Sequence, residues 1–413
     1  MIKAMVLGAV ACAFSATGFA ADVQNGHGQG VADSTTEVNG AKHEAVRSSW
    51  MDRTDIVVGV GMKDSKETHS QHHYVGESSM RHDDLNTVTS KSLKSTEINK
   101  LYIETLQPIT HYDENAKSVV FVQGRIGRSG EKISSYKLDS YWEPARPAGT
   151  FITHDKQTDK KESLGMNANI GIGYRRLSKG EHAYVGVNAF YDHVFKGGYK
   201  RVSGGVEYVA GLNEFHANLY RNLGTDDRKY IGLRGRSNVL GDPAGLYPYG
   251  LDSNQGLFNY GVVSYENHWM LSEKVAASGF DVGYSRTFKN ARWARVYADY
   301  YNWRGREAVR VGYHKLKKRD AIKGFKVGAE FHITPHLTLD AGYQTASHHL
   351  SGPYATLKYT IGTSKFAWHG GKHSENAITT ARSKMLDKVH RSDMVVQEVE
   401  EETYDHGVVD VGL

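Results

Sequence analysis

The amino-acid sequence predicts an all-β protein: a transmembrane antiparallel β-barrel of twelve strands, with a short helical linker in its lumen. Three observations lead to this fold class. The 413 residues include 44 Gly and 25 Tyr but only 7 Pro, which is typical of many strands and excludes collagen and proline-rich disorder. After the signal-like N-terminus, no apolar stretch reaches the roughly 18 residues of a membrane helix. Finally, apolar and polar residues alternate over many separate segments.

The first 20 residues are a predicted signal peptide. Lys3 precedes an apolar stretch over 4–14, and small residues continue to Ala20, the expected cleavage position. Cys12 resembles a lipidation cysteine, but Ala9 stands where such signals prefer Leu, which favours ordinary cleavage. The mature chain then has no cysteine and needs no disulfide. Its net charge of +5 is spread along the sequence, so we expect no nucleic-acid partner.

The clearest predicted strand covers 164–175. Its even positions are apolar or aromatic up to Tyr174, and its odd positions are Gly, Asn or Arg. Successive side chains of a strand point to opposite faces, so the segment has one apolar and one polar face. Two less regular segments, 101–108 and 119–126, precede it. The same alternation recurs at 183–192, 202–208, 215–219, 280–285, 294–300, 325–331, 337–343 and 355–361.

Alternating strands can also build a soluble sandwich. Segments of about 9 to 11 residues, at roughly 3.3 Å per residue and a tilt near 45°, span a hydrocarbon layer of about 25 Å. The apolar rows end in aromatic residues such as Tyr174, Tyr191 and Tyr208, as in the interfacial girdle of a membrane barrel. Charges at mid-strand on the other face suit a water-filled lumen. We therefore favour the barrel, with these residues facing the lumen: Asn167, Asn169, Arg175, Asn188, Glu207, Arg295, Asp299, Lys326 and Glu330.

Loop lengths predict the topology of a barrel over 55–365. Long connections alternate with short turns, and outer-membrane barrels have short periplasmic turns and longer outer loops. The strand at 101–108 would then begin outside, which requires an earlier strand, for which 56–62 is the candidate. The count becomes twelve, an even number that closes without a free edge. Strand-like pieces at 230–235, 258–266 and 309–313 are assigned to hairpins in outer loops; fourteen strands are the alternative.

A series of short motifs follows in order between residues 101 and 399. It includes Gly171-Ile-Gly-Tyr-Arg-Arg, Val185-Gly-Val-Asn-Ala-Phe-Tyr-Asp, Gly204-Gly-Val-Glu-Tyr, Ala217-Asn-Leu-Tyr, Gly279-Phe-Asp-Val-Gly-Tyr, Val296-Tyr-Ala-Asp-Tyr-Tyr, Val327-Gly-Ala-Glu-Phe and Thr334-Pro-His-Leu-Thr-Leu-Asp-Ala-Gly-Tyr. In this order and spacing, the set resembles the β-domain of inverse autotransporters, the intimin/invasin family.

The resemblance implies a function as well as a fold. It implies a twelve-stranded barrel in the outer membrane of a Gram-negative cell, whose C-terminal linker turns back through the lumen and carries a passenger to the surface by type V secretion. It implies cell adhesion at the level of the family. The implied partners are outer-membrane lipid, the barrel-assembly machinery and periplasmic chaperones.

The region after the barrel, 366–399, is the expected pore-threading linker. Ser374 can cap a helix of about 15 residues, which at some 22 Å could plug a lumen but not cross a bilayer. Its apolar stripe consists of Ile378, Ala381, Met385 and Val389. The family's linker signature has two Asn after an Arg, whereas Ser392 and Asp393 follow Arg391 here. The predicted linker residues in the pore are Leu386, Val389, Arg391, Val395, Val396 and Glu398.

Only residues 400–413 follow this linker. Family members continue into immunoglobulin-like and lectin-like domains, so adhesion is not carried over to this chain. Glu400-Glu401-Glu402 predicts a solvated acidic tail.

The N-terminal part is polar, with a periplasmic segment expected over 21–54. His69-x-x-His72-His73 contains metal-ligand residues, but without cysteine or a rigid helix the pattern is more typical of a mobile periplasmic arm. Some relatives carry a peptidoglycan-binding module in this region, so peptidoglycan contact is an expectation for this segment. We predict no metal and no cofactor.

Two functions other than export are compatible with parts of the sequence. Asp192-His193 at a strand end could act as an acid and base that activate water, as in surface proteases. No second carboxylate pair and no Ser and His pattern accompanies it, so we predict no enzyme. A passive porin-like channel is the stronger alternative, because the same lumen charges would conduct ions if no linker filled the pore.

Overall fold

The computed structural model describes residues 50–75, 87–113, 115–145, 150–224, 227–240, 260–305, 309–311, 314–316, 321–347, 351–362 and 381–412. They all belong to one compact unit that starts at Glu44. The predicted signal peptide, most of the polar N-terminal segment and the predicted cap Ser374 lie outside these ranges. Within these ranges, no helix has the length and apolar character needed to cross a membrane.

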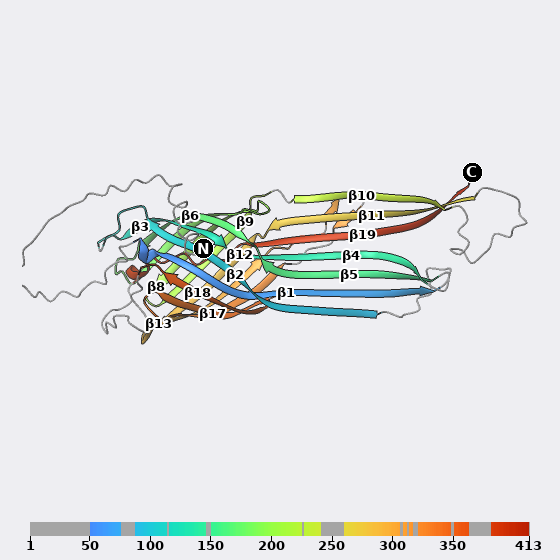
Figure 1. The fold of residues 1–413 in the computed structure, drawn as a ribbon. Helices are drawn as coiled ribbons and strands as arrows, with labels where there is room; N and C mark the ends of the chain where they lie inside the picture. Colours follow the sequence, from blue (N-terminus) through green and yellow to red (C-terminus); the bar gives the residue numbers. More distant parts are fainter. Residues whose placement is uncertain are drawn as a thin grey trace, which may run out of the picture. The chain divides into compact units, whose positions relative to one another are not determined.

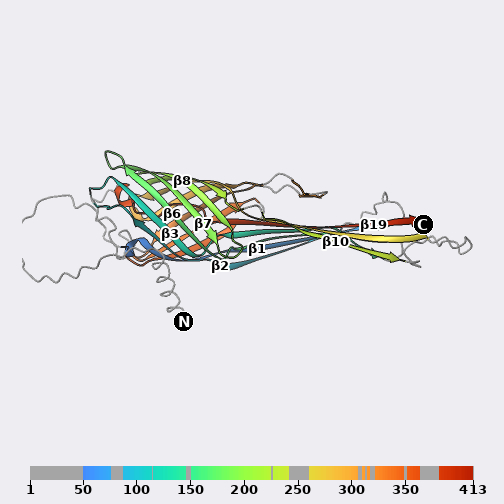
Figure 2. The same ribbon diagram turned by 90° about the horizontal axis from the view of Figure 1, so that it is seen from above.

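Twelve antiparallel strands close into a barrel (Figures 1 and 2). Around the barrel they are β1 (Thr54–Val75), β2 (Thr87–Pro108), β3 (Ser118–Arg128), β6 (Met166–Leu177), β7 (Ala183–Val194), β8 (Lys200–Ala210), β9 (Asn213–Asn222), β12 (Gly279–Phe288), β13 (Ala291–Trp303), β16 (Ile322–His332), β17 (Leu337–Ala346) and β18 (Gly352–Thr360). Each pairs with the next, and β18 pairs with β1. The predicted fold class and the count of twelve are confirmed, and fourteen is wrong.

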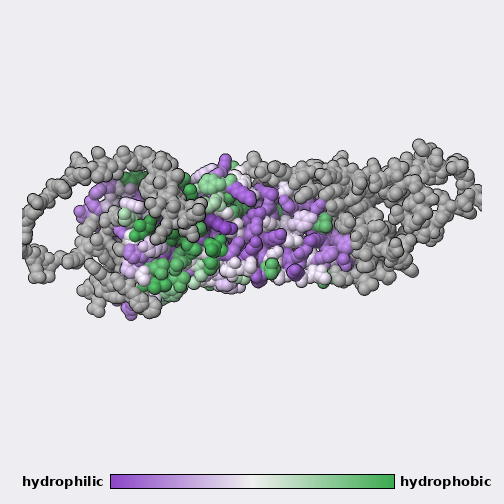
Figure 3. Space-filling view, viewed as in Figure 1, coloured by the Kyte–Doolittle hydropathy of each residue, from purple (hydrophilic) through white to green (hydrophobic). Residues whose placement is uncertain are grey.

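The side chains of each barrel strand alternate between the outer surface and the interior. On β7, Val185 and Val187 are more than half exposed, whereas Asn188 and Phe190, at the alternate positions that follow, are buried. Because the interior positions are filled, the exposed apolar row must face outward. On the face seen in Figure 3, hydrophobic residues gather over the barrel and hydrophilic ones dominate over the strands beyond it. This is the surface that a lipid layer requires.

The barrel sheet continues beyond the barrel as an open sheet of seven strands, here called the projecting sheet. It contains the outer parts of β1 and β2 together with β4 (Glu131–Ala145), β5 (Thr150–Ser163), β10 (Asp227–Leu240), β11 (Tyr260–Ala276) and β19 (Val395–Gly412). The order is β2, β1, β5, β4, β19, β11, β10. Both views show these strands running side by side away from the barrel (Figures 1 and 2).

The long connections of the sequence therefore carry hairpins. Of the strand-like pieces, 230–235 lies on β10, the described part of 258–266 on β11, and the described part of 309–313 on β14 (Val309–Val311), which pairs with β15 (His314–Leu316). The hairpin of β4 and β5 lies in a connection, 127–163, for which the sequence predicted only a loop. Its strands are rich in Lys, Asp, Ser and Thr on both faces, so they lack the apolar row by which the other strands were recognised.

The prediction of a solvated acidic tail over 400–413 is wrong. Residues 395–412 form β19, which pairs with β11 in antiparallel and with β4 in parallel orientation. Glu400 lies 3.7 Å from Lys274, and Glu402 accepts a hydrogen bond from Tyr136. The carboxylates thus meet donors on strands far away in the sequence, and two open strand edges supply the backbone partners.

The predicted linker helix is also wrong within the described residues. In the described part of the linker, η2 (Ala381–Lys384) is one 3-10 turn, and the chain from there to Met394 is irregular. The barrel wall supplies the backbone partners instead. Gln123 accepts from the Val389 nitrogen at 2.9 Å, and Arg175 donates to the Met385 carbonyl at 2.8 Å. These bonds satisfy groups that a helix would pair internally.

Candidate functional site: the lumen and its occupant

Residues 381–394, here called the lumen segment, run inside the barrel against β2, β3 and β6 to β9. The predicted linker residues Leu386 and Val389 are 4% and 6% exposed. Together with Ala381 and Met385, they pack in one cluster with these wall residues: Leu106, Val119, Phe121, Leu177, Tyr184, Phe190 and Val209. Apolar packing therefore fixes the first half of the segment.

Asp192 on β7 is the centre of an ionic contact with the second half. Its carboxylate accepts hydrogen bonds from both terminal nitrogens of Arg391, at 2.7 and 2.6 Å, and from Nε of Arg201 at 2.9 Å. Arg201 also donates to the Ser392 carbonyl at 3.0 Å. The three charged side chains are at most 7% exposed. Two cations sharing one buried carboxylate hold the predicted linker residue Arg391 against the wall.

The neighbouring His193 does not join this contact. Its ring stacks on Tyr191 and meets Phe195 edge-on, with centroids 6.5 and 5.5 Å apart. Both of those aromatic side chains are exposed, so His193 belongs to the outer row while Asp192 belongs to the interior. The acid–base pair that Asp192-His193 could have formed is not assembled.

Asp393 makes a second ionic contact that the sequence did not predict. Its carboxylate lies 3.1 Å from Lys100 and accepts a hydrogen bond from Arg125. Arg125 in turn donates to Glu104 at 2.9 Å, its cross-strand partner on β2. Part of the signal is in the sequence, because Asp393 stands where the family signature has an uncharged Asn. The pairing of Glu104 with Arg125 depends on the register of β2 and β3, which the predicted segments 101–108 and 119–126 did not fix.

Arg175, predicted to face the lumen, binds the backbone of the lumen segment. Besides the Met385 carbonyl, it donates to that of Asp387 at 2.6 Å, and the predicted lumen residue Glu207 accepts its other nitrogen at 3.0 Å. Its guanidinium lies 4.6 Å from the centre of the Phe121 ring. That ring in turn lies over Gly173, where an added Cβ would be 2.2 Å from the Phe121 Cζ atom. The Phe121 ring thus packs between the backbone of Gly173 and the guanidinium of Arg175.

Substituting Gly173 by Ala is expected to destabilise the barrel by about 1–3 kcal/mol, because the Phe121 ring cannot move without displacing Arg175. The matched control is Gly204→Ala, since the nearest atom to a Cβ there is 3.9 Å away; it should change stability by no more than about 0.5 kcal/mol. Urea unfolding in detergent micelles measures both. Equal losses in the two variants would show that the Gly173 layer has no special packing role.

Further ion pairs surround the lumen segment. Lys384 pairs with Glu214 and Lys388 with Asp55. The predicted lumen residue Arg295 lies 3.4 Å from Glu214 and 3.0 Å from Glu330. Lys384 and Lys388 of the segment therefore face acidic residues of the wall, and these two pairs could not be assigned without knowing how the wall and the segment align.

The other predicted lumen residues lie in the same interior. Asn167 is buried and donates to the Ser129 carbonyl at 2.6 Å. Asn188 is buried on β7, and Asn169 lines a small cavity beside Arg391. The structure thus brings the predicted polar residues to the inner wall, although only some of them touch the segment.

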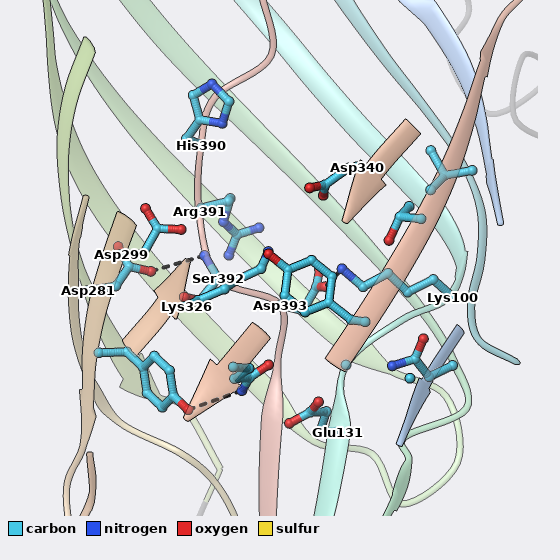
Figure 4. Close-up of a pocket in the computed structure, with 18 of the residues that line it drawn as sticks. Lys100, Glu131, Asp281, Asp299, Lys326, Asp340, His390, Arg391, Ser392 and Asp393 are labelled. Carbon is cyan, nitrogen blue, oxygen red and sulfur yellow. Dashed lines mark hydrogen bonds and ion pairs between the residues drawn. The ribbon is translucent and has the colours of Figure 1, made fainter. Parts of the chain in front are cut away.

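A cavity of about 260 Å³ remains between the lumen segment and part of the wall. Figure 4 shows the segment crossing it from His390 to Asp393, with Lys100 and Lys326 extending toward its centre. The predicted lumen residues Asp299 and Lys326 line it. On one side, Asp281 accepts the Ser392 nitrogen at 3.0 Å. The lumen is therefore only partly filled, and the remaining space is lined by charges of both signs.

The histidine pattern near the N-terminus has a different setting from the predicted periplasmic arm. His69 lies on the projecting part of β1, paired with β2 and β5. Its Nε2 atom is 3.0 Å from Nδ1 of His154 on β5. The side chains of His72 and His73 lie outside the described residues. Among the residues described, no group of three or more His, Cys, Asp or Glu is arranged to hold a metal ion.

A comparison with known families identifies the family of this barrel. The family described as "Inverse autotransporter, beta-domain" matches residues 154–393, which is more than half of the chain. The chain belongs to this family. Membership confirms the resemblance found in the sequence and implies the outer membrane as the location of the barrel.

Solved structures resemble this inverse autotransporter at low identity. A chain from a study titled "Unveiling the Mechanism Behind the in-meso Crystallization of Membrane Proteins" is 13% identical; the match covers 84% of this chain and 100% of that one, with a TM-score of 0.43. The translocator domain of autotransporter NalP from Neisseria meningitidis is 10% identical, with 72% and 88% covered and a TM-score of 0.21. A mutant Rh. blastica porin is 8% identical, with 73% and 99% covered and a TM-score of 0.21. No curated protein matches the chain.

At the barrel mouth of this inverse autotransporter, the chain leaves the lumen through two apolar clusters. Val395 packs with Tyr220, Ala277, Tyr301, Trp303 and Ile322. Val396 is fully buried in the other, with Leu164, Val194 and Ala276. The next predicted linker residue, Glu398, already belongs to the projecting sheet and lies 2.8 Å from Lys132. These contacts anchor the base of β19.

The charges around Glu398 predict a pH dependence. Burial raises the pKa of Glu398, but hydrogen bonds from Lys132 and Lys274 outweigh it and leave the pKa below its ordinary value. A carboxyl group whose pKa is lowered in the docked strand stabilises docking at pH values above the ordinary Glu pKa. This stabilisation is lost as the pH falls through the lowered pKa. Hydrogen exchange of the β19 amides, corrected for intrinsic rates, should therefore be faster near pH 3 than near pH 7. In Glu398→Gln, the increase in exchange between pH 7 and pH 3 should be smaller. An equally large increase would mean that other groups cause the pH dependence.

Proposed function

We propose that this barrel is an outer-membrane translocator and anchor that threads its C-terminal linker through the pore to the cell surface. The observation that carries the proposal is the occupied lumen, in which an irregular segment binds the wall by apolar packing and by ion pairs. A lumen that held only water would have no use for an arginine that binds backbone carbonyls, such as Arg175, or for a buried carboxylate that binds an arginine of the segment, such as Asp192.

The ends of the lumen segment support the direction of threading. Arg382, at its start, donates to Glu181 at 2.9 Å in the short turn between β6 and β7. Its end, Met394, lies at the mouth from which the projecting sheet rises, where its carbonyl accepts the Glu131 nitrogen at 3.0 Å. The segment thus runs from the end with short turns to the end with long hairpins, which in outer-membrane barrels are the periplasmic and the outer end.

The partners of such a translocator follow from the same function. Outer-membrane lipid would contact the exposed apolar rows, and the barrel-assembly machinery and periplasmic chaperones would handle the chain before insertion. Peptidoglycan contact by the N-terminal segment 21–54 stays a proposal from the family, since most of that segment lies outside the described residues.

Labelling of intact cells tests the threading. A cysteine tag after Leu413 should react with a membrane-impermeant maleimide, whereas Lys179→Cys in the short turn after β6 should react only after the outer membrane is opened. The mature chain offers no background, because its one cysteine is Cys12 in the predicted signal peptide. A tail label that appears only in opened cells would contradict the proposal.

A passive porin-like channel remains a second candidate because of one observation: the cavity of about 260 Å³ beside the lumen segment is lined by charged side chains. In that function, the linker would narrow a conducting pore rather than close it. Conductance of the full chain separates the two functions.

A further inference from the structure

The last described strand, β19, does not lie at an edge of the projecting sheet. β19 lies in the middle of the sheet, between β4 and β11. Without it, the sheet consists of two separate halves: β2, β1, β5 and β4 on one side, and β11 and β10 on the other. Each half would present one open strand edge to the other across a gap one strand wide.

The two edges of the gap carry side chains that pair with carboxylates of the strand between them. Glu398, Glu400 and Glu402 occupy alternate positions of β19 and therefore share one face. On that face, the gap presents Lys132 and Tyr136 from β4 and Lys274 from β11. Lys132 and Lys274 pair with Glu398, Lys274 also lies near Glu400, and Tyr136 donates to Glu402. Backbone pairing on both edges gives affinity, and the donors select carboxylates in one register.

β19 is held tightly at its base and weakly above it. Exposure rises along the strand from 0% at Val396 through 3% at Gln397 to 9% at Glu398, and Glu400 to Glu402 are half-buried. The described apolar clusters reach only the base of the sheet. Over Glu400 to Glu402, the strand is held by backbone pairing and by partly exposed polar contacts with Lys274 and Tyr136. Such partly exposed ion pairs contribute little. Its upper part can therefore open while Val395, Val396 and the lumen segment stay in place.

We propose that the gap between β4 and β11 is a peptide-binding site for an extended acidic strand of another protein, closed in the resting chain by β19. The ligand class is an unstructured acidic segment with carboxylates at every second residue, which enters parallel to β4. β19 acts as the competing internal strand. The inference concerns the projecting sheet alone and does not depend on whether the linker reaches the cell surface.

The test uses three full-length chains in detergent and one labelled peptide with the sequence of residues 395–412. The native chain gives the baseline. In Glu400→Lys/Glu402→Lys, the internal strand is weakened. In Lys137→Cys/Glu401→Cys, a short thiol cross-linker joins positions that are direct partners in β4 and β19 above the base, which locks the upper part of the strand. The lumen contacts are unchanged in all three, so retention of the heat-resistant folded band on gels shows that each barrel has formed.

The weakened chain should bind the peptide at least about 100-fold more tightly than the locked chain, because a tethered strand competes at a high effective concentration. Reducing the amount of cross-linker should restore baseline binding. A peptide with lysine at the positions of Glu398, Glu400 and Glu402 should not bind. Equal binding to the weakened and locked chains, no binding to a folded weakened chain, or equal binding of the lysine peptide would each overturn the proposal.

Discussion

Removing residues 372–413 is expected to turn a nearly closed barrel into an open channel. The lumen segment fills the side of the lumen against β2, β3 and β6 to β9 and leaves a cavity of about 260 Å³ beside it. Once it is gone, side chains such as Arg175, Asp192 and Arg201 would face water in a wide, charged pore. In planar bilayers, the full chain should give almost no conductance, and the shortened chain should give discrete open-channel steps.

The control for this deletion is a chain that stops at Met394, which loses β19 but keeps the lumen segment. It should conduct as little as the full chain, because the contacts of Arg391 and Asp393 are intact. If the full chain already conducts as well as the shortened one, the porin-like function is correct and the lumen segment is not a plug.

Replacing Asp192 by Ala is expected to destabilise the barrel by about 3–5 kcal/mol, because the substitution leaves two buried guanidinium groups, Arg201 and Arg391, without their carboxylate. The same loss should free the second half of the lumen segment and raise the conductance toward that of the shortened chain. Urea unfolding in micelles and bilayer recordings measure the two effects on one preparation.

Glu181→Ala provides a matched comparison for Asp192→Ala. Glu181 also binds an arginine of the lumen segment through both oxygens, Arg382, at 2.9 and 2.6 Å, but its side chain is 36% exposed. Water can replace it, so the expected loss is no more than about 1 kcal/mol. A loss at Asp192 as small as that at Glu181 would mean that the buried clamp does not hold the segment.

Most of the barrel could be predicted because lipid contact imposes a strict rule on sequence. Every second residue of a spanning strand must be apolar, and rows such as Val185, Val187 and Tyr191 carry that signal without any knowledge of their neighbours. The projecting sheet obeys no such rule. Both faces of β4 and β5 are polar, so their strands resemble a loop in the sequence.

The lumen was predicted as a surface but not as a set of contacts. Arg175, Glu207, Arg295 and Glu330 follow from strand alternation, whereas the pairs of Lys384 with Glu214 and of Lys388 with Asp55 depend on how an irregular segment passes the wall. The stripe of Ala381, Met385 and Val389 does become buried, but its spacing indicated a helix because the sequence does not reveal that Gln123 and Arg175 bind the backbone. Glu400 and Glu402 were misread for a similar reason, since Lys274 and Tyr136 are remote in the chain.

The length of β19 also determines where the chain would present anything joined to it. Eighteen residues at roughly 3.3 Å each place the last described residue about 60 Å from the mouth of the pore. β19 pairs with β11 along nearly its whole length but with β4 only as far as Thr403, so two neighbouring strands hold its first half. With the threading proposed above, an epitope fused after Leu413 would be presented well above the lipid headgroups, on a strand whose base is fixed at the mouth of the pore.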